Sequence, residues 1–114
     1  MREQSTAILL RVFIGESDKH NGQSLYEYLV HYLKKQGFAG VTVLRGIEGF
    51  GHTSKIHTAN ILELSTDLPI VLEVVDTQAK IEEFKKMLDD LDTQGNIGVL
   101  ITEETVKIIK YGKA

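Results

Sequence analysis

Residues 7–14, "AILLRVFI", form a short apolar run that is rich in β-branched side chains and stops at Gly15. Such a run predicts a β-strand. One face of the strand carries Ile8, Leu10, Val12 and Ile14. On the opposite face Leu9 and Phe13 are also apolar. A strand that is apolar on both faces needs other residues packed against both, so the fold of this chain must supply cover on each side of the strand.

A helix is predicted after the polar turn at residues 15–23. Ser24 and Glu27 have the spacing of a capping box, in which each side chain satisfies a free N–H at the helix start. Gly37 ends the helix as a left-handed cap. The apolar stripe of this helix consists of Leu25, Tyr28, Leu29, Tyr32 and Leu33, at i, i+3, i+4, i+7 and i+8.

Four further segments are predicted to be strands. "VTVLRGI" (41–47) is the second strand, and "NILEL" (60–64) alternates well enough to pair back on it. "IVLEVV" (70–75) follows the only proline, Pro69, which occupies a position where a strand can begin. "TVKIIKY" (105–111) is the last strand.

A second helix is capped by Asp76 or Thr77, and a loop at residues 92–102 leads from it to the last strand. Its inner face carries Ile81, Phe84, Leu88 and Leu91, with Met87 beside them. The order βαβ–βαβ predicts an α+β fold, the ferredoxin-like sandwich, in which two helices cover one face of a four-stranded antiparallel sheet. Residues 1–114 form one domain.

This fold leaves the second face of the sheet uncovered. The strand predicted at residues 70–75 is also apolar on both faces, because Val71 and Val75 lie opposite Ile70, Leu72 and Val74. Large exposed apolar patches are rare on soluble monomers. We therefore expect a homo-oligomer whose sheets face inward.

Bulk composition narrows the function classes. The chain has 13 Lys and Arg against 16 Asp and Glu, a net charge of −3, which disfavours a nucleic-acid binder. It has no cysteine, which excludes disulfides, zinc–thiolate sites and thiol catalysis. No apolar run is long enough to span a bilayer, and residues 1–18 lack the pattern of a signal peptide. A cytoplasmic location is expected.

The stretch "LRGIEGFGHTSKIH" (44–57) has two interpretations. Gly46 and Gly49 could permit a bulge or a positive φ at a hairpin corner, with Phe50 plugging the edge of the core. Alternatively, Gly46, Gly49 and Gly51 could clear the backbone for a ligand. The pattern lacks the strand-to-helix order of a dinucleotide fingerprint.

A second glycine pair, Gly95 and Gly98, lies in the loop before the last strand. Two glycine-bearing loops could offer backbone N–H groups to a phosphate. Arg45 and Lys110 are the strand-borne cations that could complete such a site.

Metal binding and catalysis have weaker signals. His52 and His57 lie five residues apart without a third ligand, so no metal is predicted. Glu16, Asp18 and Lys19 form a charged turn, but nothing places a nucleophile beside them, and we expect no enzyme.

Three longer segments carry a resemblance to a known family. They are "GESDKHNGQSLYEYLV" (15–30), "GFAGVTVLRGIEGFG" (37–51) and "DLPIVLEVVD" (67–76). The chain resembles the nitrogen-regulatory PII signalling proteins, and more closely the PII-like branch known only as a domain of unknown function. The resemblance implies a ferredoxin-like fold, a trimer with its sheets packed inward, and adenine-nucleotide binding in the clefts between subunits.

The resemblance also assigns residues. Gly49-Phe50-Gly51 match the base of the family's mobile T-loop, Thr42 matches a threonine near the adenine, Gly95 to Gly98 match the nucleotide-clasping B-loop, and Lys110 replaces a phosphate-binding arginine. With Arg45 from the glycine-loop argument, the candidate nucleotide site comprises Thr42, Arg45, Gly49, Phe50, Gly51, His52, Gly95, Asn96, Ile97, Gly98 and Lys110.

Departures from the family pattern affect the expected ligand. Val99-Leu100 stand where PII proteins continue Asp-Gly-Lys, and Ile108 replaces a second arginine. His52 and Thr53 replace an arginine and a glutamine. The T-loop is shorter and has no tyrosine for modification. Fewer cations favour AMP or ADP over ATP.

The resemblance thus implies a trimeric adenine-nucleotide sensor in which occupancy orders the loop at residues 50–58 and changes the surface shown to a transporter, channel or enzyme. The alternative is a trimeric scaffold of the CutA type that binds a divalent metal or nothing. An RNA-recognition motif has the same element order but stacks bases on sheet aromatics, of which the first strand has only Phe13 and residues 70–75 none.

Overall fold

The computed structural model describes residues 1–50, 57–58, 68–95 and 97–112. Its main elements, in chain order, are β1 (Arg2–Gly15), α1 (Leu25–Lys35), β4 (Val41–Arg45), β7 (Pro69–Asp76), α2 (Gln78–Leu91) and β8 (Leu100–Tyr111). Two short ladders accompany them, β2 (Lys19–His20) with β3 (Gln23–Ser24), and β5 (Glu48–Gly49) with β6 (His57–Thr58).

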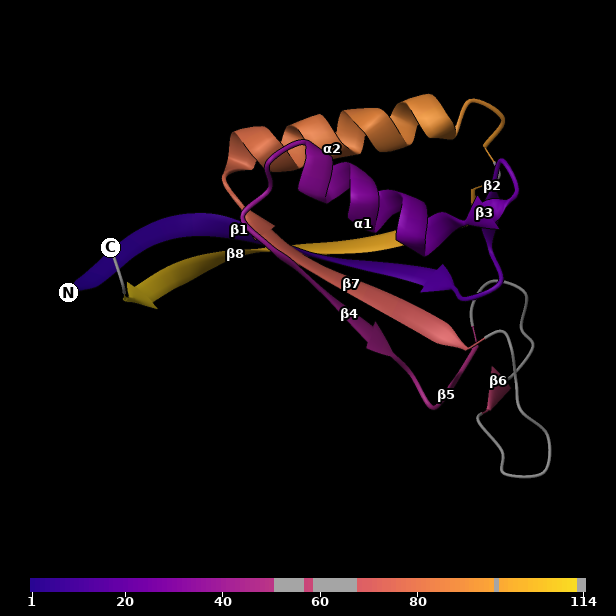
Figure 1. Ribbon diagram of the computed structural model, residues 1–114, viewed down its shortest axis with the longest axis horizontal. Helices are drawn as coiled ribbons and strands as arrows, with labels where there is room; N and C mark the ends of the chain where they lie inside the picture. The colour runs from indigo at the N-terminus through magenta and orange to yellow at the C-terminus, as the bar shows by residue number, and fades with distance from the viewer. Residues whose placement is uncertain (51–56, 59–67, 96, 113–114) are drawn as a thin grey trace.

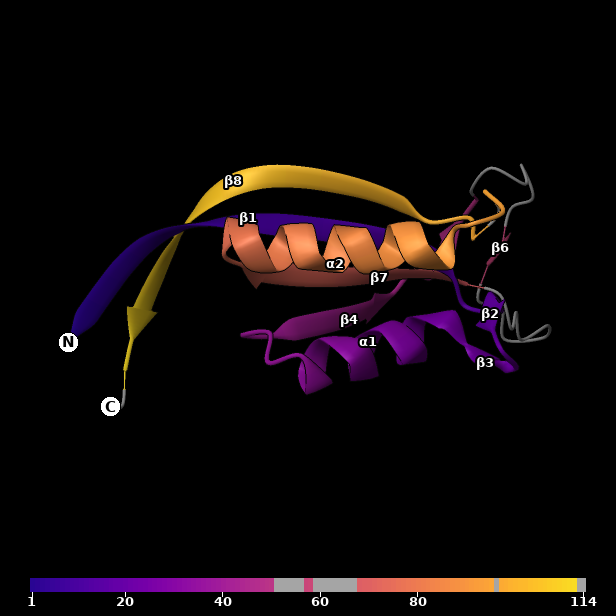
Figure 2. The same cartoon turned by 90° about the horizontal axis from the view of Figure 1, so that it is seen from above.

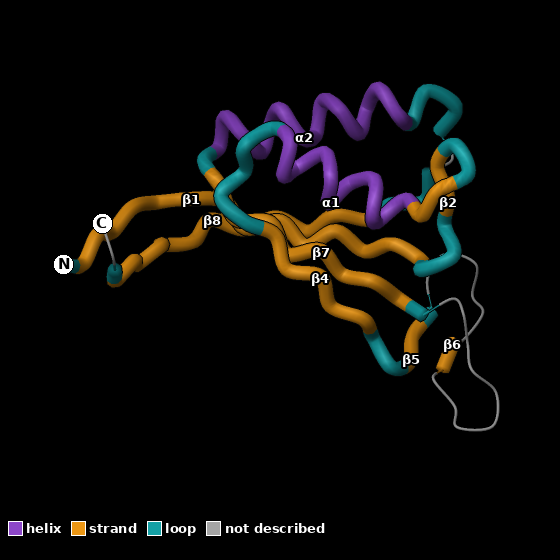
Figure 3. Tube along the Cα trace, viewed as in Figure 1, coloured by secondary structure: helices purple, strands orange, loops and turns teal. Residues whose placement is uncertain are grey.

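The four long strands form one antiparallel sheet in the order β4-β7-β1-β8 (Figure 1). Both helices lie on one side of this sheet, as a layer over the strands (Figures 1 and 3). The predicted ferredoxin-like α+β fold is therefore confirmed. Among the described residues, neither helix is long and apolar enough to cross a membrane.

The core lies between the sheet and the helices. Leu10, Val12 and Ile14 of β1 and the even-numbered residues Ile70, Leu72 and Val74 of β7 are buried in it, as the alternation in the sequence predicts. The predicted apolar stripes of both helices meet them. The core residues with no exposed surface are Leu10, Val12, Leu29, Leu72, Val74, Ile81 and Phe84.

The ends of α1 are set by backbone contacts. Ser24 occupies the N-cap position, but its side chain makes no capping hydrogen bond, so the predicted capping box is wrong. Instead, the Leu25 N–H donates to the Asp18 carbonyl at 2.8 Å. At the other end Gly37 has φ 77°, and Phe38 N–H donates to the Leu33 carbonyl at 3.0 Å, a Schellman motif that confirms the predicted glycine cap.

We expect Gly37→Ala to lower the free energy of unfolding by about 1 kcal/mol, because a Cβ is disfavoured in the left-handed region. A Cβ at Gly37 would meet only the Lys80 Nζ at 4.0 Å, so backbone conformation and not a clash is tested. Urea unfolding measures the change. An unaltered midpoint would show that the cap does not limit stability.

Helix α2 begins at Gln78, and its N-cap is Thr77, one of the two predicted caps, whose hydroxyl oxygen accepts from the Lys80 N–H at 3.3 Å. The neighbouring Asp76 carboxylate accepts from the Thr77 N–H at 2.7 Å and from the Ala39 N–H at 2.8 Å. The second contact fixes the chain between α1 and β4 against the end of β7.

Several element ends differ from the prediction. β1 begins at Arg2 and β8 at Leu100, because the two pair continuously from Arg2↔Tyr111 to Phe13↔Leu100. The loop predicted at residues 92–102 therefore ends at Val99. β4 stops at Arg45, two residues early. The predicted strand at 60–64 lies outside the described residues.

The turn at residues 15–23 contains an unpredicted hairpin, formed by β2 and β3. Asn21 and Gly22 have φ values of 50° and 83°, as the corner of a type I′ turn requires.

Seen from above, α2 lies over β1 and β7 (Figure 2), and on the opposite face of the sheet no described helix covers the strands (Figure 1). Leu44 and Leu100 are 47% and 64% exposed there, and the half-buried side chains of this bare face are Leu9, Phe13, Val71 and Val75. Arg11 lies among them and donates to Glu73 at 3.0 Å and to Glu104 at 2.8 Å. The hydrogen bonds to Glu73 and then Glu104 raise the pKa of Arg11. The bare face is thus an apolar surface that carries one cluster of paired charges, Arg11 with Glu73 and Glu104.

Candidate functional site

The glycines at the end of β4 pack against Pro69. The Gly46 N–H donates to the Pro69 carbonyl at 2.7 Å. A Cβ on Gly46 would lie 2.7 Å from Pro69 Cγ, and one on Gly49 would lie 3.0 Å from the same atom. Neither glycine has a positive φ, so that part of the turn interpretation is wrong. The proline ring thus excludes a Cβ at Gly46, and at Gly49 it leaves room for one only if it shifts by a few tenths of an ångström.

We expect Gly46→Ala to destabilise the protein by about 1–3 kcal/mol, the usual range for overpacking, because the Pro69 ring cannot move away without shifting the start of β7. Thermal unfolding measures this. Gly40→Ala is the matched control, since a Cβ at Gly40 meets nothing within 4 Å. Equal stability of both variants would contradict the close approach.

The Glu16 carboxylate connects chain segments that lie around these glycines. Glu16 Oε1 accepts from Arg45 Nη2 at 2.9 Å and from the Leu68 N–H at 3.4 Å, while the Glu16 N–H donates to the Leu68 carbonyl at 2.9 Å. The Glu16 side chain is 21% exposed and that of Arg45 54%. Glu16 thus joins the charged turn to the last residue of β4 and to the residue before β7.

Asp18 makes a further hydrogen bond within the same turn. Asp18 Oδ2 accepts from the Gly15 N–H at 3.0 Å, which confirms turn chemistry as the role of this carboxylate. Tyr26 lies next to the cluster. Burial, followed by the Glu27 and Glu16 carboxylates, raises the pKa of Tyr26, and the Arg45 charge opposes the shift.

The second glycine loop follows α2. Gly95 and Gly98 have φ values of 69° and 72°, so both adopt the left-handed conformation that favours glycine. Asp92 organises this turn, because its carbonyl accepts from the Gly95 N–H at 2.9 Å and its Oδ1 accepts from the Ile97 N–H at 3.0 Å. The sequence reasoning missed Asp92, although an aspartate just before a glycine turn is a known signal.

The two loop bases lie at one end of the sheet but on opposite edges. Leu100 pairs with Phe13, and Pro69 pairs with Gly15, so β8 starts and β4 ends near the same end of β1. Three strand spacings separate β4 from β8, roughly 14 Å. A single chain therefore does not bring Arg45 and Gly98 into one pocket.

Lys110 lies still farther away. It pairs with Glu3 near the far end of β8, ten residues and about 33 Å of extended strand from Leu100. Within one chain, strand β8 therefore carries Lys110 away from the glycine loops, and its role in a phosphate site stays a prediction. A contact from Lys110 would have to come from another copy.

The remaining candidates are dispersed. Thr42 is exposed on the bare face of β4, opposite Glu73. Phe50 is 69% exposed and does not plug the core edge. Gly51, His52 and Asn96 lie outside the described residues.

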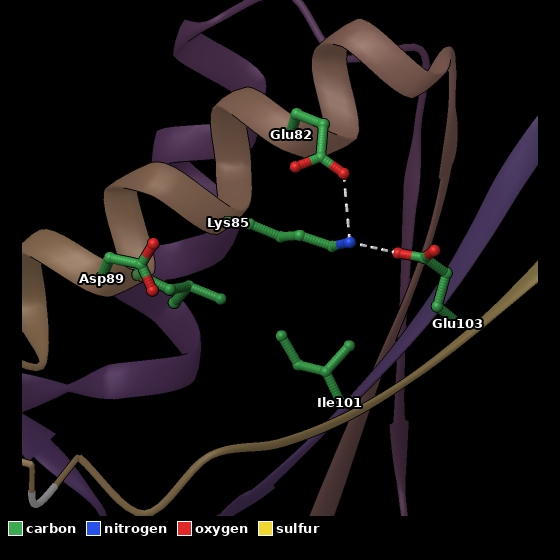
Figure 4. Close-up of a pocket in the computed structure, with 6 residues that line it drawn as sticks. Glu82, Lys85, Asp89, Ile101 and Glu103 are labelled. Carbon is green, nitrogen blue, oxygen red and sulfur yellow. Dashed lines mark hydrogen bonds and ion pairs between the residues drawn. The ribbon is translucent and has the colours of Figure 1, made fainter.

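A groove between α2 and β8 lies apart from these residues (Figure 4). Its lining residues are Glu82, Lys85, Leu88, Asp89, Ile101 and Glu103. Lys85 Nζ bonds to Glu82 at 3.2 Å and to Glu103, and these bonds, Glu103 first, raise the pKa of Lys85. Three carboxylates and one ammonium line this groove, and two of the carboxylates pair with the ammonium, which makes the groove unsuited to a phosphate. Among the described residues, no group of three His, Asp or Glu side chains could hold a metal ion.

Comparison with solved structures confirms the PII-like fold. The apo form of CPII from Thiomonas intermedia K12, a nitrogen regulatory PII-like protein, superposes with a TM-score of 0.65 at 10% identity, over 97% of this chain and 100% of CPII. CPII bound to ADP, AMP and bicarbonate gives 0.62 at 13% identity, over 93% and 91%. A putative PII-like signaling protein from Thermus thermophilus gives 0.64 at 14% identity, over 93% and 92%.

Sequence relatives extend over most of the chain. A UPF0166 protein of Aquifex aeolicus (strain VF5) is 36% identical, over 89% of this chain and 91% of its own. A UPF0166 protein of Methanocaldococcus jannaschii is 30% identical, over 85% and 88%. Residues 7–108 match the family DUF190, described as "Uncharacterized ACR, COG1993". The chain therefore belongs to the DUF190 family, and it has the PII-like fold.

Proposed function

We propose that this chain is a PII-like regulatory protein that assembles as a homotrimer and binds AMP or ADP in the clefts between subunits. The observation that carries the proposal is the position of the two glycine loops, at one end of the sheet and on opposite edges. The likeness to CPII, which has been solved with ADP and AMP, supports the choice of ligand.

Assembly would complete the site. In a cyclic oligomer the same two edges of neighbouring copies meet at every interface. The β8 edge of one copy, with Gly95 and Gly98, would then lie beside the β4 edge of the next, with Thr42, Arg45 and Gly49. Each interface between two copies, called a seam below, would then hold one complete set of these residues. Within a single chain the two halves of the set lie about 14 Å apart.

The bare face favours such an assembly. Its apolar side chains surround one ion cluster in which Arg11 pairs with both Glu73 and Glu104, so packing this face inward leaves the guanidinium with partners. An oligomer whose sheets face inward covers Leu44 and Leu100 without any further element of the chain.

The ligand class follows from the available cations. Val99-Leu100 and Ile108 provide no phosphate contacts of the PII kind, which leaves Arg45 as the cation at the end of β4. A short phosphate chain suits this site better than a triphosphate. Nucleotide binding would regulate a partner, such as a transporter, channel or enzyme, by favouring one state of the segment after Phe50, which requires different affinities for the two states.

Isothermal titration calorimetry with AMP, ADP and ATP tests the proposal. We expect one site per chain, with AMP or ADP bound more tightly than ATP. Adenosine and GMP are the controls for the phosphate and for the base. No heat of binding with any adenine nucleotide at millimolar concentration would contradict the proposed function.

A further inference from the structure

Arg45, the cation assigned to the proposed site, already has an anion beside it. Its Nη2 lies 2.9 Å from Glu16 Oε1, and its side chain is 54% exposed, so an anion in solution can reach the guanidinium. A phosphate at Arg45 would therefore approach a second negative charge, the Glu16 carboxylate.

Glu16 cannot easily move aside. Its N–H donates to the Leu68 carbonyl at 2.9 Å, and its Oε1 also accepts from the Leu68 N–H at 3.4 Å. The next turn is fixed by Asp18, which accepts from the Gly15 N–H at 3.0 Å. Swinging the carboxylate away from Arg45 would break its hydrogen bond with the Leu68 N–H. Glu16 is thus a fixed charge, only 21% exposed.

A fixed carboxylate beside the cation distinguishes anions by their charge. One phosphate group can share the guanidinium, which presents five N–H donors. Each further phosphate in a chain adds negative charge within several ångströms of Glu16, where partial burial weakens solvent screening.

We propose that Glu16 is a specificity-determining residue that makes the Arg45 site select short phosphate chains over long ones. The inference rests on the proposed nucleotide site and adds a residue to it. The Glu16 carboxylate would repel the additional phosphates of a longer chain. This repulsion would favour mono- or diphosphates together with the lack of further cations at the site.

The test uses Glu16→Gln, which removes the charge and keeps an oxygen that can accept from Arg45 and from the Leu68 N–H. The probes are inorganic phosphate, pyrophosphate and tripolyphosphate, titrated into the full chain by calorimetry. We expect the variant to bind tripolyphosphate about tenfold more tightly than the wild type, with a smaller gain for phosphate, as Coulomb repulsion in a partly screened site predicts.

Two further variants keep the test sharp. Glu16→Asp retains the charge and should keep the wild-type order of affinities. Glu82→Gln removes a carboxylate from the separate α2–β8 groove and should change nothing. A melting temperature for Glu16→Gln within the range of these controls would show that it folds.

Equal tripolyphosphate affinity of wild type and Glu16→Gln, or no binding by either, would overturn the inference. The same gain in Glu16→Asp would also overturn it, since the charge would then not be the cause. These results are distinct from failure of the proposed function, which adenine nucleotides test. Inorganic chains carry no adenine, so failure of the inference and failure of the proposed function give different results.

Discussion

If the protein assembles as the proposed trimer, Val71→Lys should give monomers instead. Val71 lies on the bare face at the centre of the sheet, between Phe13 on β1 and Leu44 on β4. If the sheets pack inward, three added ammonium groups would be buried close together without partners, which costs far more than the assembly could recover. Analytical ultracentrifugation of the variant and the wild type measures the change.

The chain offers a matched control. Ala79 is exposed in the first turn of α2, on the helical side of the sheet, so Ala79→Lys adds the same charge away from the bare face. We expect Ala79→Lys to sediment as the wild type does. A Val71→Lys variant that remained a trimer would show that the bare face is not the interface.

Phe84→Ala should lower the free energy of unfolding by about 3–5 kcal/mol, the usual cost of truncating a buried aromatic side chain. Phe84 has no exposed surface, and its ring centroid lies 6.2 Å from that of Phe38 and 6.3 Å from that of Tyr32. It therefore joins α2 to α1 and to the chain that follows α1. Removing its ring would open a cavity between the two helices.

Guanidinium unfolding at one fixed protein concentration measures this loss, because assembly makes stability depend on concentration. Lys86→Ala, at an exposed position two residues further along α2, is the control and should change stability little. A loss below about 1 kcal/mol for Phe84→Ala would contradict the tight packing of the helical layer.

The hydrophobic pattern predicted the fold, because the apolar residues of both helices and of β7 recur with the period of the element that they form. Strand lengths could not be predicted in the same way. The polar residues Arg2 to Thr6 lack strand alternation, and they extend β1 only because β8 pairs with them from about a hundred residues away. The β2–β3 corner at Asn21-Gly22 did carry a local hairpin signal.

The site was predicted less well, for an equally physical reason. The glycine pattern located both loop bases, but it could not reveal that Gly46 and Gly49 make room for Pro69, because that contact depends on the sheet register. The ion pair between Glu16 and Arg45 joins residues 29 positions apart and leaves no periodic signal. The distance of Lys110 from the loops likewise follows from the length of β8.

Native mass spectrometry of the wild-type chain with ADP tests the central claim most directly, since it reports assembly and ligand number together. We predict a species of three 12.8 kDa chains that carries up to three nucleotides, one for each seam. Single chains of 12.8 kDa without bound nucleotide, under conditions that preserve a known trimer, would contradict the account.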